Sequence, residues 1–166
     1  MTALEQFKIK WCDPNADVSP IQRADLERLE GELDFVFPED YLDQLSKAGS
    51  VAPTIGLVAA ICQQNDQDMD FELSDLTLMF GAADVKSATL GPEAKIGTKH
   101  VAIAKDCQGN LFCFKRVAQP NTRPKTAFVY IYDLDFKDFE LVSSSFDGWI
   151  KSYLAPWTRE FDWRYR

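Results

Sequence analysis

VAIAKDCQGNLFCFKRV, residues 101–117, consists of two apolar runs on either side of a five-residue turn. The runs at 101–105 and 111–117 have the length and apolar content of strands. Asp106, Gly109 and Asn110 suit the turn, because Asn and Gly tolerate a left-handed backbone and Asp accepts bonds from its own local amides. The stretch therefore predicts a β-hairpin.

The chain after this hairpin predicts a second pair of strands and a helix. Residues 119–125 hold two prolines and two basic residues, which indicates an exposed loop. Residues 127–132 are apolar on both faces, as expected of a central strand covered on both sides, and 139–143 predict its hairpin partner. Ser144 or Ser145 then caps a last helix, whose expected core stripe is Phe146, Trp149, Ile150, Tyr153 and Leu154.

Two helices are expected near the start of the chain. Ser19, Pro20 and Gln22 form a helix start with a capping box, and a stripe of leucines follows. Pro38 begins a second helix, which Gly49 ends.

The segment between the helices and the hairpin has strand-like patterns. Residues 54–62 are apolar and β-branched, which predicts a strand. Residues 68–73 alternate strictly, with Met69, Phe71 and Leu73 on one side and acidic residues on the other, which predicts a half-buried strand with an acidic outer face. Residues 76–80 predict a third strand or a helical turn, and 82–90 a short helix or a loop.

Helices followed by a run of strands and then a helix predict an α+β fold. We expect a mainly antiparallel sheet of about five to six strands, with helices packed at both ends of the chain. A length of 166 residues is typical of one domain, here 1–166.

The charge is distributed unevenly. Residues 1–85 carry 17 acidic and 5 basic residues, for a net charge of −12, whereas residues 86–166 carry 9 and 13, for +4. An acidic chain repels nucleic acid and anionic membranes and attracts basic proteins. Charge alone favours a surface that is acidic for solubility.

Catalytic and metal chemistry find little support in the residues. Counted from Asp66, an EF-hand loop would place Phe71 and Thr77 where Gly and Glu are required. His100 paired with Cys107 or Cys113 is a weak candidate for a nucleophile and its base. No cofactor motif is present.

Cysteine usage and the N-terminus bear on localisation. The four cysteines show no CxxC spacing, which predicts buried free thiols in a reducing compartment rather than a zinc site. The N-terminus does not resemble a signal peptide, which predicts a cytoplasmic protein. The sequence has no run of about 20 apolar residues, so no membrane span is expected.

Three motifs, in order, resemble the SUKH superfamily, which includes the Smi/Knr cell-wall-assembly family. They are LDFVFPEDYL at 33–42, running on to Gly49; IAKDCQGNLFCF at 103–114; and VYIYDLD at 129–135, followed by 141–150 with Ser145-Phe146 and Trp149. Together they span most of residues 19–154. Two mild departures are Ala48-Gly49-Ser50, where the family usually has Gly-Gly or Asn-Gly, and Phe37-Pro38 in place of Leu-Pro.

The resemblance implies helices on a curved mixed or antiparallel sheet and a function without catalysis. Many bacterial members of the superfamily resemble immunity proteins that bind and neutralise toxin domains, often nucleases, and fungal members act in cell-wall regulation through protein contacts. We therefore expect a protein-binding module whose partner is a toxin domain encoded nearby. A regulatory scaffold is the alternative, and a small cysteine hydrolase the least favoured reading.

The acidic first half supplies the expected partner-binding residues, with no nucleic acid, membrane or cofactor involved. They are Asp40, Asp43, Asp66, Asp68, Asp70, Glu72 and Asp75. The aromatic tail, 155–166, is expected to cover the core, and a homodimer through it is the alternative.

Overall fold

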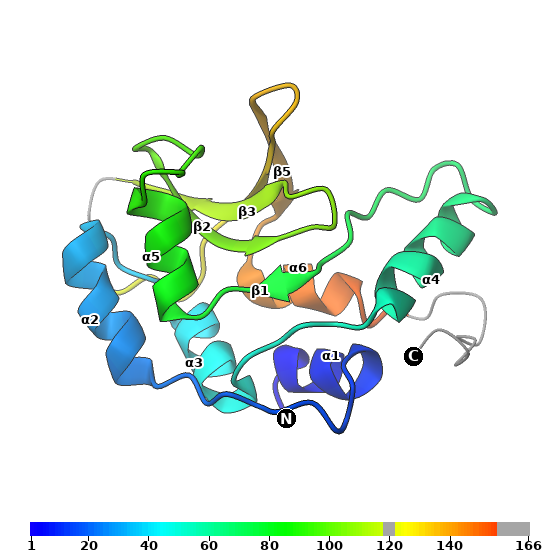
Figure 1. The fold of residues 1–166 in the computed structure, drawn as a ribbon, viewed down its shortest axis with the longest axis horizontal. Helices are drawn as coiled ribbons and strands as arrows, with labels where there is room; N and C mark the ends of the chain where they lie inside the picture. Colours follow the sequence, from blue (N-terminus) through cyan, green and yellow to red (C-terminus); the bar gives the residue numbers. More distant parts are fainter. Residues whose placement is uncertain (118–121, 156–166) are drawn as a thin grey trace.

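A five-stranded antiparallel sheet forms the centre of the computed structural model, which describes residues 1–117 and 122–155 (Figure 1). Its strands follow the chain order as a meander. They are β1 (Leu78–Met79), β2 (His100–Lys105), β3 (Leu111–Lys115), β4 (Val129–Asp133) and β5 (Asp138–Ser143). The predicted α+β class is confirmed, as are both hairpins, and every strand pair is antiparallel.

The sheet curls strongly. His100 of β2 and Phe139 of β5 stack with their ring centroids 3.7 Å apart, although β3 and β4 lie between their strands. In a flat sheet those two strands would be about 14 Å apart. Irregularities in register at Ala102/Ala104 and at Val129/Tyr130 give local bends of the kind that β-bulges produce. In Figure 1, β5 accordingly rises steeply from β2 and β3.

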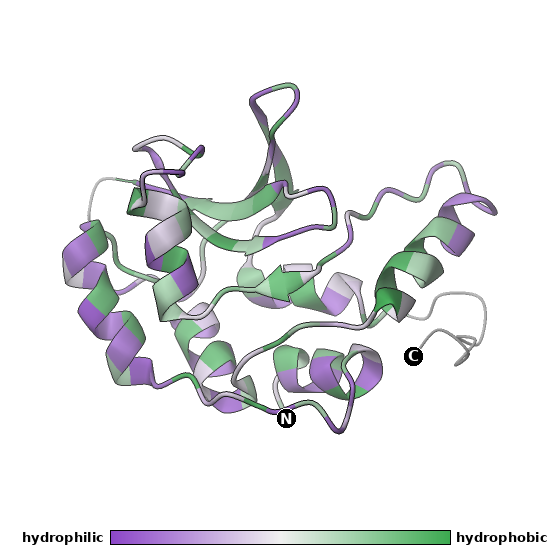
Figure 2. Cartoon of the chain, viewed as in Figure 1, coloured by the Kyte–Doolittle hydropathy of each residue, from purple (hydrophilic) through white to green (hydrophobic). Residues whose placement is uncertain are grey.

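Two helices, α3 (Glu39–Ala48) and α6 (Phe146–Ser152), cover one face of the sheet. Helix α1 (Ala3–Trp11) packs against both of them, and its Phe7 ring lies 5.4 Å from that of Tyr153. Tyr41 of α3 contacts Phe114 at 5.4 Å between ring centroids, and Trp149 of α6 contacts Phe112 at 4.5 Å. These rings are fully buried and form the centre of the core. Figure 2 shows β2 and β3 as hydrophobic through their middle residues, with hydrophilic residues at strand ends.

Two further helices, α2 (Arg23–Leu33) and α5 (Ala82–Leu90), flank the sheet on the side of β2. The Thr89 hydroxyl of α5 accepts a 3.1 Å bond from the Ala102 amide, which the short β1 leaves unpaired. The structure therefore confirms a short helix at 82–90 and, within 76–80, a strand at β1.

The predicted strand at 54–62 is wrong, because the chain forms α4 (Ile55–Asn65) there. Thr54 caps this helix, its side chain accepting from the Gly56 amide at 3.3 Å. Leu57 and Ile61, one helical turn apart, are its buried side chains. A short apolar run alone does not distinguish a buried strand from a buried helix. Here the helix continues past the apolar run through polar residues to Asn65.

The predicted strand at 68–73 is also wrong, because the segment is an irregular connection with turns at its start. The Asp68 carboxylate accepts from the Asp70 amide at 3.0 Å, which favours a turn over an extended backbone. Phe71 and Leu73 pack partly against the core as expected, but Met69 is 96% exposed. The alternation therefore identifies two inward-facing side chains and no sheet strand.

Two helix starts differ from those predicted from the sequence. Helix α2 begins at Arg23, and its cap Gln22 makes no side-chain bond. Ser19 lies instead beside the chain after α3, where its carbonyl accepts from the Ser50 amide at 2.9 Å. Helix α1 was not predicted, although Thr2 and Glu5 form a capping box. Pro38, Gly49 and Ser145 take their expected positions as helix caps.

Two expectations concern residues that the structure describes only in part or not at all. Residues 119–121 of the expected loop and the tail from 156 onward lie outside the described residues. The expected central strand, β4, lies inside the sheet but next to its edge, and three of its five residues are only half-buried.

Candidate functional site

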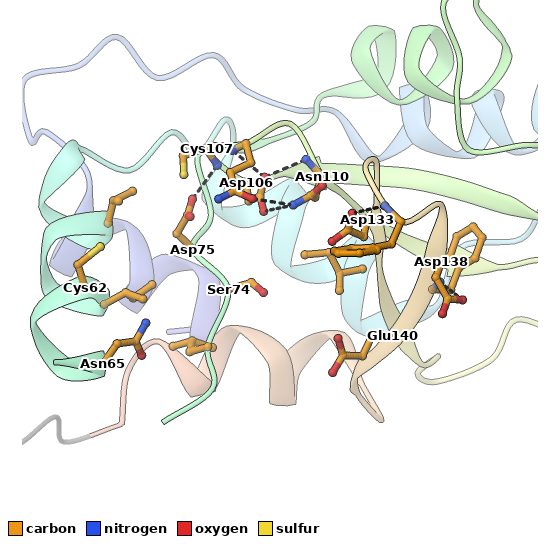
Figure 3. Close-up of a pocket in the computed structure, with 17 residues that line it drawn as sticks. Cys62, Asn65, Ser74, Asp75, Asp106, Cys107, Asn110, Asp133, Asp138 and Glu140 are labelled. Carbon is orange, nitrogen blue, oxygen red and sulfur yellow. Dashed lines mark hydrogen bonds between the residues drawn. The ribbon is translucent and has the colours of Figure 1, made fainter. Parts of the chain in front are cut away.

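A groove opens between α4 and the β4–β5 hairpin (Figure 3). It consists of two adjoining hollows of about 650 and 660 Å³. Helix α4 and residues 71–75 form one wall, and the β4–β5 hairpin forms the other. The turn at 106–110 closes one end, and α6 lies at the other. The hollows share five lining residues, namely Asn65, Leu73, Ser74, Ile131 and Glu140.

Carboxylates dominate the polar lining, so we call this feature the acidic groove. Among the described lining residues of both hollows there is no lysine or arginine. Leu73, Ile131 and Trp149 supply apolar surface between the acidic side chains. The acidic residues of the groove are Glu72, Asp75, Asp106, Asp133, Asp138 and Glu140.

Four of these six carboxylates accept from the local backbone; Asp138 accepts from the amide of the next residue at 2.8 Å, and the other three accept from residues further away in the sequence. Asp106 is buried and accepts from the Asn110 amide at 2.8 Å and from its side-chain nitrogen at 2.9 Å, as the turn chemistry predicts. Asp75 accepts from the Cys107 amide at 2.8 Å, which joins the wall to the turn. Asp133 accepts from the Phe136 amide at 2.9 Å. These three groups therefore shape the groove.

Glu72 and Glu140 differ from the other carboxylates of the groove. Both are exposed, both line the same hollow from opposite walls, and neither carboxylate makes a hydrogen bond or ion pair with any residue that the structure describes. Like charges on facing walls attract a cationic group placed between them. These two side chains are therefore available to a basic ligand.

The structure divides the seven predicted partner-binding residues into two groups. Glu72 and Asp75 line the acidic groove. Asp66, Asp68 and Asp70 lie on the exposed connection that leaves α4 for the groove wall.

Asp40 and Asp43 belong to α3 instead. The Asp40 carboxylate accepts from the Asp147 amide at 3.2 Å, and burial raises the pKa of Asp40 above its usual range. Asp43 pairs with Lys47 one turn later, at 2.7 Å. These two carboxylates therefore already have contacts within the chain.

Much of the remaining acidic excess is neutralised within the fold. The Arg23 guanidinium bonds both oxygens of Glu39, at 2.6 and 2.9 Å. Arg123, from the second half of the chain, pairs with Glu30 and donates to the Phe37 carbonyl at 2.9 Å. The acidic face of α2 and α3 is therefore balanced by arginines, in contrast to the groove.

The candidate cysteine–histidine chemistry is not assembled. His100 is buried at the start of β2 under the Phe139 ring, and burial, with Lys115 and Lys99 nearby, lowers its pKa to about 4. Cys107 follows the other end of β2, where the bond to Asp75 raises its pKa to about 11. Burial raises the pKa of Cys113 to about 12. These thiols are protonated near neutral pH and therefore poor nucleophiles.

The expectation of buried cysteines holds for half of them. Cys12 and Cys113 are buried, but Cys62 and Cys107 are exposed and line the groove. Across residues 1–117 and 122–155 there is no cluster of three or more His, Cys, Asp or Glu side chains arranged for a metal ion. No helix in the same ranges has the length and apolar content of a membrane span.

Sequence reasoning missed the groove's second wall, where Asp133, Asp138 and Glu140 lie. A signal was present, because Glu140 lies within the strand predicted at 139–143 and Asp138 directly precedes it, each next to an apolar residue. Alternation places such side chains on one face of a strand. Pairing that face with residues 71–75 required the tertiary structure.

Fold and groove together define an α+β domain in which a curled antiparallel meander packs against helices from both ends of the chain. The family model SUKH_6, described as SMI1-KNR4 cell-wall, matches residues 23–150. That is well over half of the chain, and the chain therefore belongs to this SUKH family. No curated protein and no solved structure was found to match it.

Proposed function

We propose that this chain is a non-enzymatic protein-binding module, an intracellular immunity protein that binds and neutralises a basic toxin domain. Membership of the SUKH family supports this, because immunity proteins are frequent in that superfamily. A nuclease is a suitable toxin, because nucleases use basic surfaces to hold their anionic substrate. The gene for such a toxin is expected near the gene for this chain.

The acidic groove is the observation that carries the proposal. Its lining combines six carboxylates and no described basic residue with apolar surface. Acidic residues around such a groove increase the association rate of a basic partner, and buried apolar contacts slow its dissociation. The same residues would occupy the basic cleft of the toxin in place of its substrate.

The proposed contact residues combine the sequence prediction with the groove. Glu72 and Asp75 are proposed on one wall, and Asp138 and Glu140 on the other. Further contacts are proposed on the exposed connection beside the first wall, at Asp66, Asp68 and Asp70. Asp40 and Asp43 are proposed as an outer contact on α3, where their existing bonds reduce the charge available to a partner.

A non-catalytic function is supported by the state of the thiols. Cys107 is exposed in the groove but protonated, since its pKa is raised to about 11. An activated cysteine requires the opposite shift, toward or below neutrality.

A regulatory scaffold is the second candidate function, favoured by the cell-wall description of the family model. Both functions require protein contacts, but they differ in the number of partners. Affinity capture of the full chain separates them: one stoichiometric toxin-like partner supports immunity, and a set of envelope-synthesis proteins supports regulation.

Co-expression tests the immunity function. The toxin domain encoded beside this chain is induced in a sensitive host with and without the chain. Full protection at equal expression is the expected result. Cell death at the same rate in both cultures would contradict the proposal.

A further inference from the structure

Strand β5 is the exposed edge of the sheet beside the groove. Within the described residues it pairs with β4 alone. Four consecutive residues of β5, Glu140 to Ser143, line the groove. Consecutive residues of a strand point to opposite faces, so the edge of β5 with its backbone borders the groove.

The facing wall has the same character. Phe71, Glu72, Leu73 and Ser74 are also four consecutive lining residues, in a segment that is neither helix nor strand. The hollow between two such stretches of backbone is a slot, and an extended chain is the shape that fits a slot beside a strand edge.

Natural proteins usually protect a sheet edge with lysine, proline or a covering segment. Strand β5, Asp138–Ser143, contains neither lysine nor proline. Leu141 on this edge is 56% exposed. Asp138 and Glu140 are its only charges, and both are negative. A second copy of β5 would bring these acidic side chains together, whereas a basic strand would neutralise them.

We propose that the partner enters the acidic groove as an extended basic segment that pairs with the edge of β5 as a sixth strand. This inference rests on the proposed function for the existence of a protein partner and specifies how that partner is bound. Main-chain hydrogen bonds to β5 supply part of the affinity, and the charges select the segment.

Strand geometry also determines the pattern of the bound segment. Asp138 and Glu140 lie on one face of β5 and Phe139 and Leu141 on the other, before the register irregularity that falls at Val142. Side chains of an added strand lie beside side chains on the same face. The segment therefore alternates, with lysine or arginine on the Glu140 face, where Glu72 also reaches it, and apolar residues on the Leu141 face.

A designed peptide tests this on the full chain without any toxin. The probe is a blocked hexapeptide of alternating lysine and valine. Its controls are the block-sequence isomer, with three lysines followed by three valines, and a copy N-methylated at alternate residues, which keeps the charge but loses main-chain donors. Amide hydrogen exchange of residues 138–143 is followed by NMR as each peptide is added up to millimolar concentration.

The alternating peptide is expected to slow exchange in β5 by at least about tenfold, and the N-methylated peptide to leave it unchanged. Glu140→Lys should abolish the protection, whereas Asp17→Lys, an equal charge change at an exposed loop residue, should preserve it. Equal protection by all three peptides, or none up to millimolar concentration, would overturn strand pairing. Protection without peptide that rises with protein concentration would identify a second copy as the occupant and overturn the basic segment.

The outcome is separable from that of the proposed function. A chain that protects cells from the toxin but shows no β5 protection in the toxin complex remains an immunity protein with a different contact mode. If the chain binds the alternating peptide but does not protect cells from the toxin, the strand-pairing site is supported and the immunity function is contradicted.

Discussion

The Tyr153 hydroxyl donates a 2.8 Å hydrogen bond to the carbonyl oxygen of Ser74. The same hydroxyl accepts from the Trp149 indole nitrogen at 3.1 Å. Tyr153 is fully buried, and burial raises the pKa of its phenol above the usual range, so the donor proton is retained. This bond ties the groove wall at 71–75 to the core through the end of α6.

Tyr153→Phe should therefore weaken both the fold and the groove. The substitution leaves the Trp149 donor and the Ser74 carbonyl without this partner, which costs about 1–2 kcal/mol in the free energy of unfolding. Urea denaturation measures the loss. Tyr130→Phe, at a half-buried ring whose hydroxyl makes no described bond, is the matched control. Equal stability of the two variants would contradict the anchoring role of Tyr153.

Arg123→Ala should be more destabilising than Arg23→Ala. Arg123 is the less exposed of the two and holds Glu30 and the Phe37 carbonyl, while Glu30 also accepts from the Phe37 amide at 2.8 Å. Its removal leaves a partly buried carboxylate without its cation, at a cost of about 2 kcal/mol. Arg23 and its partners are more exposed, and its loss should cost less than about 1 kcal/mol. Urea midpoints of both variants check the order, and the reverse order would contradict it.

The stability of the fold should depend on pH through His100. Its pKa is lowered to about 4 in the folded chain, below the ordinary value near 6.5, so between these values the unfolded chain binds the extra proton. The free energy of unfolding should therefore fall as the pH is lowered from about 6.5 to 4, by on the order of 2–3 kcal/mol from this residue. Above about pH 7 its contribution should not vary.

His100→Phe separates this effect from the titration of carboxylates in the same pH range. The phenyl ring retains stacking on Phe139 but carries no proton. The difference in stability between the natural chain and the variant should change with pH only between about 4 and 6.5. A constant difference across that interval would show that His100 titrates normally in the folded chain.

The reactivity of Cys107 should be low although the side chain is exposed. The bond to Asp75 raises its pKa to about 11, so alkylation by iodoacetamide at pH 8 should be slow and should accelerate up to about pH 11. Asp75→Asn removes the negative charge and should lower this pKa, which increases the labelling rate at pH 8. Peptide mapping by mass spectrometry follows Cys107 alone. Rapid labelling of the natural chain at pH 7 would contradict this prediction and support Cys107 as a nucleophile.

Sequence predicted secondary structure best where turn or capping residues mark the boundary of an element. Gly109, with a φ of 88°, and the capping Asp106 determine the first hairpin within a few residues. The Ser145 hydroxyl, which accepts a hydrogen bond from the Gly148 amide at 2.9 Å, determines the start of α6 in the same way. Such elements need no distant contact to be recognised.

The sequence-based predictions failed where tertiary contacts determine the secondary structure. Residues 54–62 are β-branched enough for a strand, but Thr54 is fixed beside Trp11, whose carbonyl accepts from the Thr54 amide at 2.9 Å, and a helix starts from there. The alternating residues 68–73 pair with neither edge strand of the sheet, β1 or β5, and a turn at their start replaces the extended backbone. The acidic groove required Glu72 and Glu140, 68 positions apart in the sequence, to line one hollow.

Binding of the neighbouring toxin domain to charge-reversed chains tests the acidic groove most directly. Dissociation constants are measured by calorimetry for the natural chain, for Glu72→Lys with Glu140→Lys, and for Asp13→Lys with Asp17→Lys as the matched control of equal charge change. The groove variant should bind at least about 100-fold more weakly, since two charges facing the partner are reversed, and the control should stay within about fivefold. Equal weakening in both double variants, or none in the groove variant, would contradict the groove as the binding site.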